Sequence, residues 1–129
     1  MNTRLLMRTS ALVLGVAGLA ATFLPQEILA GTGAAPTGFG VVAVQIAGAA
    51  YLGFAFLNWM AQGNAIGGIY SRPVAIGNVT HFMVAGLALL KSGLLTQHLA
   101  LLAGAAAYAV FAVLFAYVAF AHSPPAPGA

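Results

Sequence analysis

Four long apolar stretches account for most of this chain of 129 residues. They are Leu5–Phe23, Phe39–Met60, Val74–Leu94 and Leu99–Ala121. A helix needs about 20 apolar residues to cross the hydrocarbon core of a bilayer, which is about 30 Å thick. The sequence therefore predicts an all-α membrane protein, an antiparallel bundle of four transmembrane helices in a single domain. The expected helices cover residues 5–23, 38–62, 73–94 and 97–121, with 122–129 as a flexible tail.

Composition excludes several classes of function. Charged residues make up 4% of the chain, whereas soluble domains carry about 25%. The four cations are not clustered on one face, so the sequence predicts no nucleic-acid partner. Cysteine is absent, which excludes disulfides, thiolate metal sites and a cysteine nucleophile. No catalytic or metal-binding motif stands out, and we predict a protein that is not an enzyme.

The positions of the charges predict an orientation. Arg4 and Arg8 precede the first expected helix, and Arg72 lies between the second and the third. Glu27 and Lys91 fall on the opposite side of the membrane. Because cytoplasmic segments carry an excess of lysine and arginine, both termini are expected in the cytoplasm.

The first stretch also fits a second interpretation. A basic segment followed by an apolar run is typical of a secretory signal peptide, with a cleavage site conceivable after Ala30. The run is long for such a peptide, and Ile28 is a poor residue three positions before the cut. We expect a retained helix, and cleavage remains the alternative.

Several residues predict where helices end. Pro25 should stop the first helix, and residues 31–36 form a connector. Thr37, Ser71 and Thr96 are candidate N-caps, while Gly63 and Asn64 suggest a left-handed C-cap. A tight turn is expected over Ser92–Gln97.

Small residues recur at helical spacing on two of the expected helices. Because lipid provides little hydrophobic drive between helices, small residues that permit close approach mark packing surfaces. The first helix carries Ala11, Gly15, Gly18 and Thr22, and the last carries Ala105, Ala109, Ala112, Ala116 and Ala119. Tyr108, Phe111 and Phe115 are assigned to lipid or a partner.

A polar cluster is predicted at the cytoplasmic ends of the second and third helices. Asn58 and Gln62 end one helix, and Asn78 and His81 begin the next, at one expected depth. Unpaired amides in hydrocarbon cost several kcal/mol, so these four side chains should hydrogen-bond to one another. One interpretation is a set of bonds that only holds helices together. The other is a pocket, closed by the Arg72 loop, that binds a headgroup, a quinone or a substrate.

Two ligand hypotheses attach to nearby residues. His81 and His98 lie near opposite membrane faces and cannot both ligate one haem iron, so no cofactor is expected. A haem held by His81 alone or shared between protomers remains the alternative. The loop with Gly67, Gly68 and Arg72 can hold a phosphate through backbone N–H groups, although a plain interfacial turn is the preferred interpretation.

Three segments carry a family resemblance. Leu57-Asn-Trp-Met-Ala-Gln-Gly, Gly67-Gly-Ile-Tyr-Ser-Arg-Pro and Gly77-Asn-Val-Thr-His-Phe resemble small four-helix bacterial inner-membrane proteins of the broad DoxX-like kind. The resemblance implies a four-helix bundle in the inner membrane, and some members of that group accompany redox enzymes or quinone-linked oxidases. Small multidrug transporters share the size, but their glutamate in the middle of the first helix has no counterpart here.

The sequence as a whole favours an accessory role. We predict a structural or accessory subunit that packs against other membrane subunits, or against itself, through its alanine and glycine surfaces. The alternative is binding or transport of a small molecule, lipid or quinone through a pocket formed by Asn58, Gln62, Arg72, Asn78 and His81.

Overall fold

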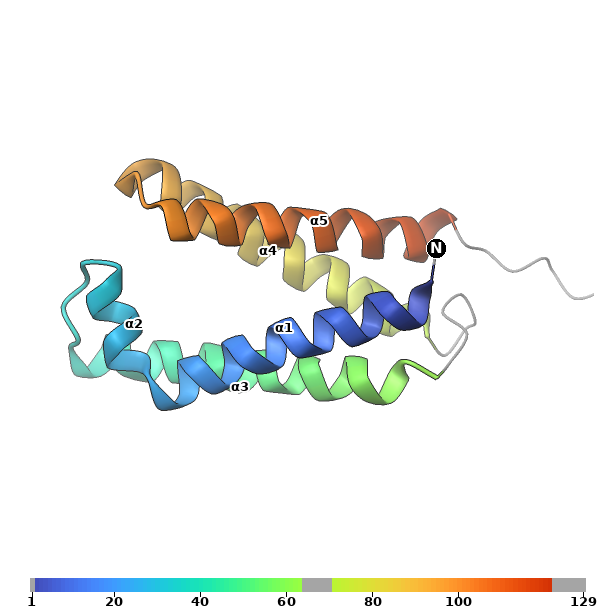
Figure 1. Ribbon diagram of the computed structural model, residues 1–129, viewed down its shortest axis with the longest axis horizontal. Coiled ribbons are helices and arrows are strands. Elements are labelled where there is room, and N and C mark those ends of the chain that lie inside the picture. The colour runs from blue at the N-terminus through green and yellow to red at the C-terminus, as the bar shows by residue number, and fades with distance from the viewer. Residues whose placement is uncertain (1, 64–70, 122–129) are drawn as a thin grey trace, which may run out of the picture. The chain divides into compact units, whose positions relative to one another are not determined.

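The computed structural model describes residues 2–63 and 71–121, and in these ranges the chain is helical without strands. Its helices are α1 (Thr3–Phe23), α2 (Pro25–Gly31), α3 (Gly38–Ala61), α4 (Arg72–Thr96) and α5 (Leu99–Ala121) (Figure 1). The predicted all-α class is confirmed. Within the described ranges α1, α3, α4 and α5 are long and apolar enough to cross a membrane, which indicates a multi-pass membrane protein. The predicted tail, 122–129, lies outside the described residues.

The chain divides into two compact units. One is Arg4–Gln62, which holds nearly all of α1 together with α2 and α3. The other joins Met1–Thr3 to Gly63–Ala129 and holds α4 and α5. Each unit is built around one pair of long antiparallel helices, and the prediction of a single domain stays a prediction.

The short helix α2 was not expected from the sequence. Pro25 does end α1, as predicted, and Leu24 breaks the helical conformation with φ −124° and ψ 41°. Pro25 then begins α2, because the N–H group that proline lacks would have no intrahelical partner in the first turn. Glu27 lies in that first turn, where a negative charge suits the helix dipole. A Cβ on Gly40 would lie 3.3 Å from Leu29 Cδ1, so α2 packs closely on the start of α3.

Two of the predicted N-caps are right in position but lack the expected side-chain hydrogen bond. Thr37 and Ser71 occupy the N-cap positions of α3 and α4, but neither side chain makes the capping hydrogen bond. Gln62 is the C-cap of α3 and keeps a right-handed conformation. Gly33 is the one described glycine with positive φ, so the left-handed cap expected at Gly63 is wrong. Asn64, the other residue of that prediction, lies outside the described range.

The turn between α4 and α5 falls later than predicted. α4 continues through Thr96, whose hydroxyl donates to the Ser92 carbonyl one turn back (2.8 Å) and therefore does not cap α5. Gln97 takes the left-handed conformation at φ 53°, which ends the helix. The N–H groups of Gln97 and His98 both donate to the Gly93 carbonyl.

The packing surface of small residues predicted on the first helix is confirmed, and its partner is α3. A Cβ on Gly18 would lie 3.0 Å from the Gly48 carbonyl oxygen and 3.0 Å from the Leu52 nitrogen. One on Gly15 would lie 3.7 Å from Ala55 Cβ. The two helices therefore approach to backbone contact, as small residues allow in apolar surroundings. Farther along, Gln45 Nε2 donates to the Thr22 carbonyl (3.4 Å), a cross-helix bond.

The contact between α4 and α5 differs from the prediction. Tyr108 is 7% exposed and Phe115 is fully buried, so the assignment of this aromatic face to lipid or a partner is wrong. Phe82 of α4 stacks on Phe111 and Phe115, with ring centroids 4.8 and 5.7 Å away, and meets Tyr108 edge-on at 5.1 Å. Glycines on α4 explain this arrangement, because they leave room for large side chains on α5.

Two glycines show this directly. A Cβ on Gly86 would lie 3.2 Å from Tyr108 Cβ, and one on Gly93 would lie 2.8 Å from Leu102 Cδ2. Of the predicted alanine surface on α5, Ala105 and Ala119 are buried, whereas Ala109 is exposed. Both helices therefore contribute small residues to this contact, with the closest approaches at the two glycines of α4.

Candidate functional site

Asn58 lies in a buried polar contact between α1 and α3. Its Nδ2 donates to Ser10 Oγ (3.0 Å), and Ser10 Oγ donates to the Met7 carbonyl (3.0 Å). Asn58 and Ser10 are both 0% exposed. Ser10 is a partner that the sequence analysis missed, because a serine that bonds to its own helix does not stand out in an apolar run.

Gln62, the C-cap of α3, makes a second link one turn farther along the chain. The Arg8 guanidinium donates through Nε to Gln62 Oε1, while Gln62 Nε2 donates to the Trp59 carbonyl (2.7 Å). Arg8 precedes Ser10 in α1, whereas its partner Gln62 follows Asn58, the partner of Ser10. This reversed order is that of two antiparallel helices. The two amides of the predicted cluster thus hold α1 to α3.

Asn78, His81 and Arg72 belong to the other unit. Asn78 is fully buried, and its Nδ2 donates to the Val74 carbonyl of the same helix (2.9 Å). His81 is partly buried against the rings of Phe82 and Tyr108, with centroids 5.2 and 5.7 Å away. Arg72 is exposed at the start of α4.

Asn78 lies on the buried face of α4. Asn78 shares the buried face with Ala75, Phe82, Gly86 and Gly93. Ala88 and Ser92, on the same helix, are exposed. The spacing of Phe82, Gly86 and Gly93 was the available signal, because steps of three and four also connect these residues.

The five residues of the predicted ligand-binding pocket are divided between the two units. Asn58 and Gln62 lie in one compact unit, and Arg72, Asn78 and His81 lie in the other, so their joint pocket stays a prediction. His98 stands at the α4–α5 turn, whereas His81 lies at the level of Tyr108. No group of three histidine or carboxylate side chains suited to a metal ion occurs in the described residues. Gly67 and Gly68 lie outside those residues.

The bond between Asn58 and Ser10 gives a testable prediction. In a double-mutant cycle of Asn58→Leu and Ser10→Ala, we expect a coupling free energy of about 0.6 kcal/mol, and at most about 1.7 kcal/mol, as for polar bonds between membrane helices. Unfolding in mixed micelles with increasing SDS measures it. Strictly additive single effects would contradict the structural assignment of this bond.

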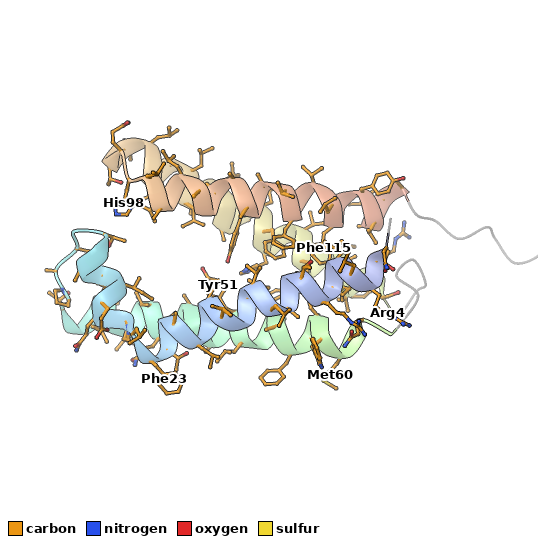
Figure 2. All side chains as sticks on the ribbon, in the orientation of Figure 1. Arg4, Phe23, Tyr51, Met60, His98 and Phe115 are labelled. Atoms are coloured by element: carbon orange, nitrogen blue, oxygen red, sulfur yellow. The ribbon has the colours of Figure 1, made fainter. Side chains whose placement is uncertain are left out.

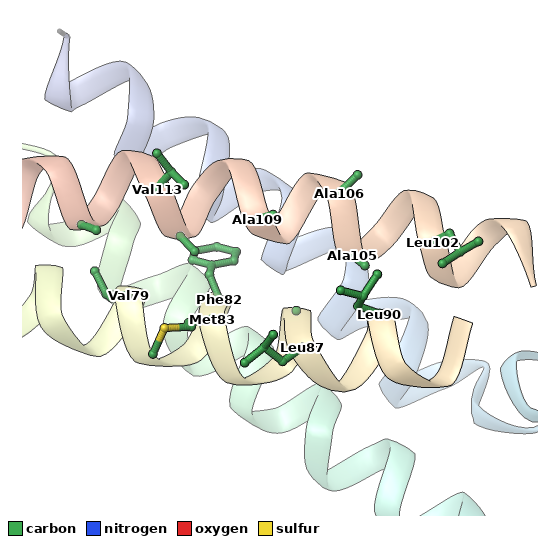
Figure 3. Close-up of a pocket in the computed structure, with 13 residues that line it drawn as sticks. Val79, Phe82, Met83, Leu87, Leu90, Leu102, Ala105, Ala106, Ala109 and Val113 are labelled. Atoms are coloured by element: carbon green, nitrogen blue, oxygen red, sulfur yellow. The ribbon is translucent and has the colours of Figure 1, made fainter. Parts of the chain in front are cut away.

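Each unit carries an apolar groove on its surface, formed by residues that the structure describes. The first follows α1 and α3, has a volume of about 400 Å³ and is lined by Ala11, Leu12, Gly15, Leu19, Leu52, Ala55, Phe56 and Trp59. The second follows α4 and α5, with a volume of about 460 Å³ (Figure 3). Other exposed apolar side chains include Phe23 and Met60, which point away from the α1–α3 pair (Figure 2).

Comparison with known proteins adds no family assignment. No protein-family model matches the chain, and no curated protein or solved structure is detectably similar to it. The resemblance to DoxX-like proteins therefore stays a prediction.

Proposed function

We propose that this protein is an accessory membrane subunit that binds a transmembrane helix of a different subunit along the α1–α3 groove. The observation that carries the proposal is the shape of that groove. Its floor is formed by the small residues Ala11, Gly15 and Ala55. Small residues let a partner backbone approach closely, which is the main source of helix association in lipid.

The walls of the groove are large and exposed. Phe56 is 68% exposed and Trp59 is 50% exposed, and both line the groove from α3. Leu12 and Leu19 line it from α1 and are 60% and 51% exposed. A groove with small residues between aromatic and aliphatic side chains fits the ridge of side chains on another helix. Aromatic residues of this kind are frequent anchors of protein interfaces.

The polar residues of this unit support a scaffold role. The side-chain amides of Asn58 and Gln62 form hydrogen bonds with α1 and with the Trp59 carbonyl. The positions of Arg4 and Arg8 at the start of α1 favour a cytoplasmic N-terminus in a bacterial inner membrane. The resemblance to DoxX-like proteins, some of which accompany redox enzymes, fits the same role.

Photo-crosslinking in native membranes tests the proposal. A photoreactive side chain is placed in turn at Leu52, Phe56 and Trp59, and at the matched α3 positions Gly53, Leu57 and Met60. The second set is exposed but does not line the groove. We expect adducts with one other membrane protein at the groove positions and several-fold fewer at the controls.

Two results would overturn the proposal. Equal adduct yields at both sets of positions would mean that the groove has no preferred partner. Adducts at twice the mass of this chain would show that a second copy fills the groove.

A further inference from the structure

The groove between α4 and α5 has dimensions that suit one lipid chain. It is lined from α4 by Val79, Met83 and Leu90 among others, and from α5 by Leu102 and Val113 among others (Figure 3). At about 1.5 Å per helical residue, the lining runs for about 16 Å along α4. One leaflet of the hydrocarbon core, half of about 30 Å, has nearly the same depth.

The lining is apolar, and its α5 side is built largely of alanine. Ala106, Ala109, Ala112 and Ala116 leave a smooth channel beside the larger side chains of α4. Phe82, held against the rings of α5, forms part of the base of the channel. An apolar chain laid in this channel contacts protein atoms on both sides, which strengthens its dispersion interactions relative to bulk lipid.

Along α4, Lys91 comes directly after the last residue that lines the groove. Lys91 follows the lining residue Leu90 and lies one helical turn beyond the lining residue Leu87. Lys91 is exposed, and α4 and α5 contain no carboxylate residue. A lysine near the end of a membrane helix extends its ammonium group to the interface, where lipid phosphates lie.

We propose that the α4–α5 groove binds one anionic phospholipid, with an acyl chain in the apolar channel and the headgroup phosphate at the Lys91 ammonium. Charge selects the lipid class and groove shape holds the chain. Both halves of the site belong to one compact unit, so the proposal is independent of the partner proposed for the α1–α3 groove.

Native mass spectrometry of the full chain in micelles tests this site. The probes are phosphatidylglycerol and phosphatidylcholine with identical acyl chains. We expect the protein to retain phosphatidylglycerol preferentially. Lys91→Gln should reduce that preference about fivefold, as expected for the loss of one lysine near the headgroups, whereas Lys91→Arg should preserve it.

A second pair of variants tests the channel. Ala109→Leu fills the groove and should weaken binding of both lipids about tenfold. Ala107→Leu is the matched control, because Ala107 is an exposed alanine of the same helix outside the groove, and it should leave lipid binding unchanged. Far-ultraviolet circular dichroism verifies that each variant keeps its helices.

Three results would overturn the proposal. Equal retention of the two lipids by the unchanged protein would remove the role of Lys91. Equal effects of Ala109→Leu and Ala107→Leu would remove the role of the channel. A change in oligomeric state on Ala109→Leu, without a change in lipid retention, would assign the groove to a second copy of the chain.

Discussion

Replacing Gly48 by alanine should destabilise the α1–α3 unit by about 1–3 kcal/mol, the usual cost of overpacking a tight contact. The added Cβ would lie 2.8 Å from Thr22 Oγ1, 3.0 Å from Ala21 Cβ and 3.0 Å from the Gly18 carbonyl oxygen. Thr22 cannot easily move aside, because its hydroxyl donates to that same Gly18 carbonyl (2.8 Å). The helices must therefore separate at their closest point.

Gly53 provides a matched control on the same helix. A Cβ added there meets nothing within 4 Å, so Gly53→Ala should be neutral or slightly stabilising through its higher helix propensity. Unfolding of both variants by SDS in mixed micelles gives the comparison. Similar unfolding midpoints for Gly48→Ala and Gly53→Ala would contradict the close approach of α1 and α3.

Phe82→Ala should be the most damaging substitution in the α4–α5 unit. Phe82 is 0% exposed and contacts three rings of α5. Removing a buried phenylalanine typically costs about 3–5 kcal/mol. We expect about 3 kcal/mol here, because transfer to an apolar bilayer contributes less than transfer to water and the lost ring contacts and the cavity dominate.

The control for this prediction is Phe120→Ala. Phe120 lies on α5 and is 68% exposed, so its removal should change the unfolding free energy by a few tenths of a kcal/mol, as for other surface substitutions. SDS unfolding monitored by circular dichroism measures both. If the two variants lose the same stability, the aromatic cluster does not hold the two helices together.

The sequence was informative about which segments are helices and less so about which faces they bury. Length and apolar composition sufficed to predict α1, α3, α4 and α5 to within a few residues. In a membrane, side chains that face lipid and side chains that face protein are both apolar. Phe115 and Phe120 illustrate the consequence, since one is 0% and the other 68% exposed although their residue type is the same.

Small residues predicted the packing surfaces better than large apolar residues did, although the prediction for the α4–α5 pair named only one of the two helices. Gly15 and Gly18 lie in the α1–α3 contact, as their spacing predicted. On the α4–α5 pair, the prediction named the alanines of α5 and omitted Gly86 and Gly93 of α4. Glycine permits a closer approach than alanine, so those two positions explain why Tyr108 and Leu102 fit beside α4.

Polar residues were recognised individually, but their partners were harder to predict. Asn58 was identified as a buried amide, whereas its partner Ser10 follows only from the antiparallel alignment of α1 and α3. The close approach of Gly18 and Gly48 belongs to the same alignment. The helix α2 was missed because Pro25 both ends α1 and begins α2.

The most direct test of four membrane crossings is the accessibility of single cysteines. The chain contains no cysteine, so one can be introduced without background at Asn2, Gly33, Gly63 or Gln97. A membrane-impermeant thiol reagent should label Asn2→Cys and Gly63→Cys from one side of the membrane, and Gly33→Cys and Gln97→Cys only from the other. Labelling of Gly33→Cys and Gly63→Cys from the same side would contradict this account.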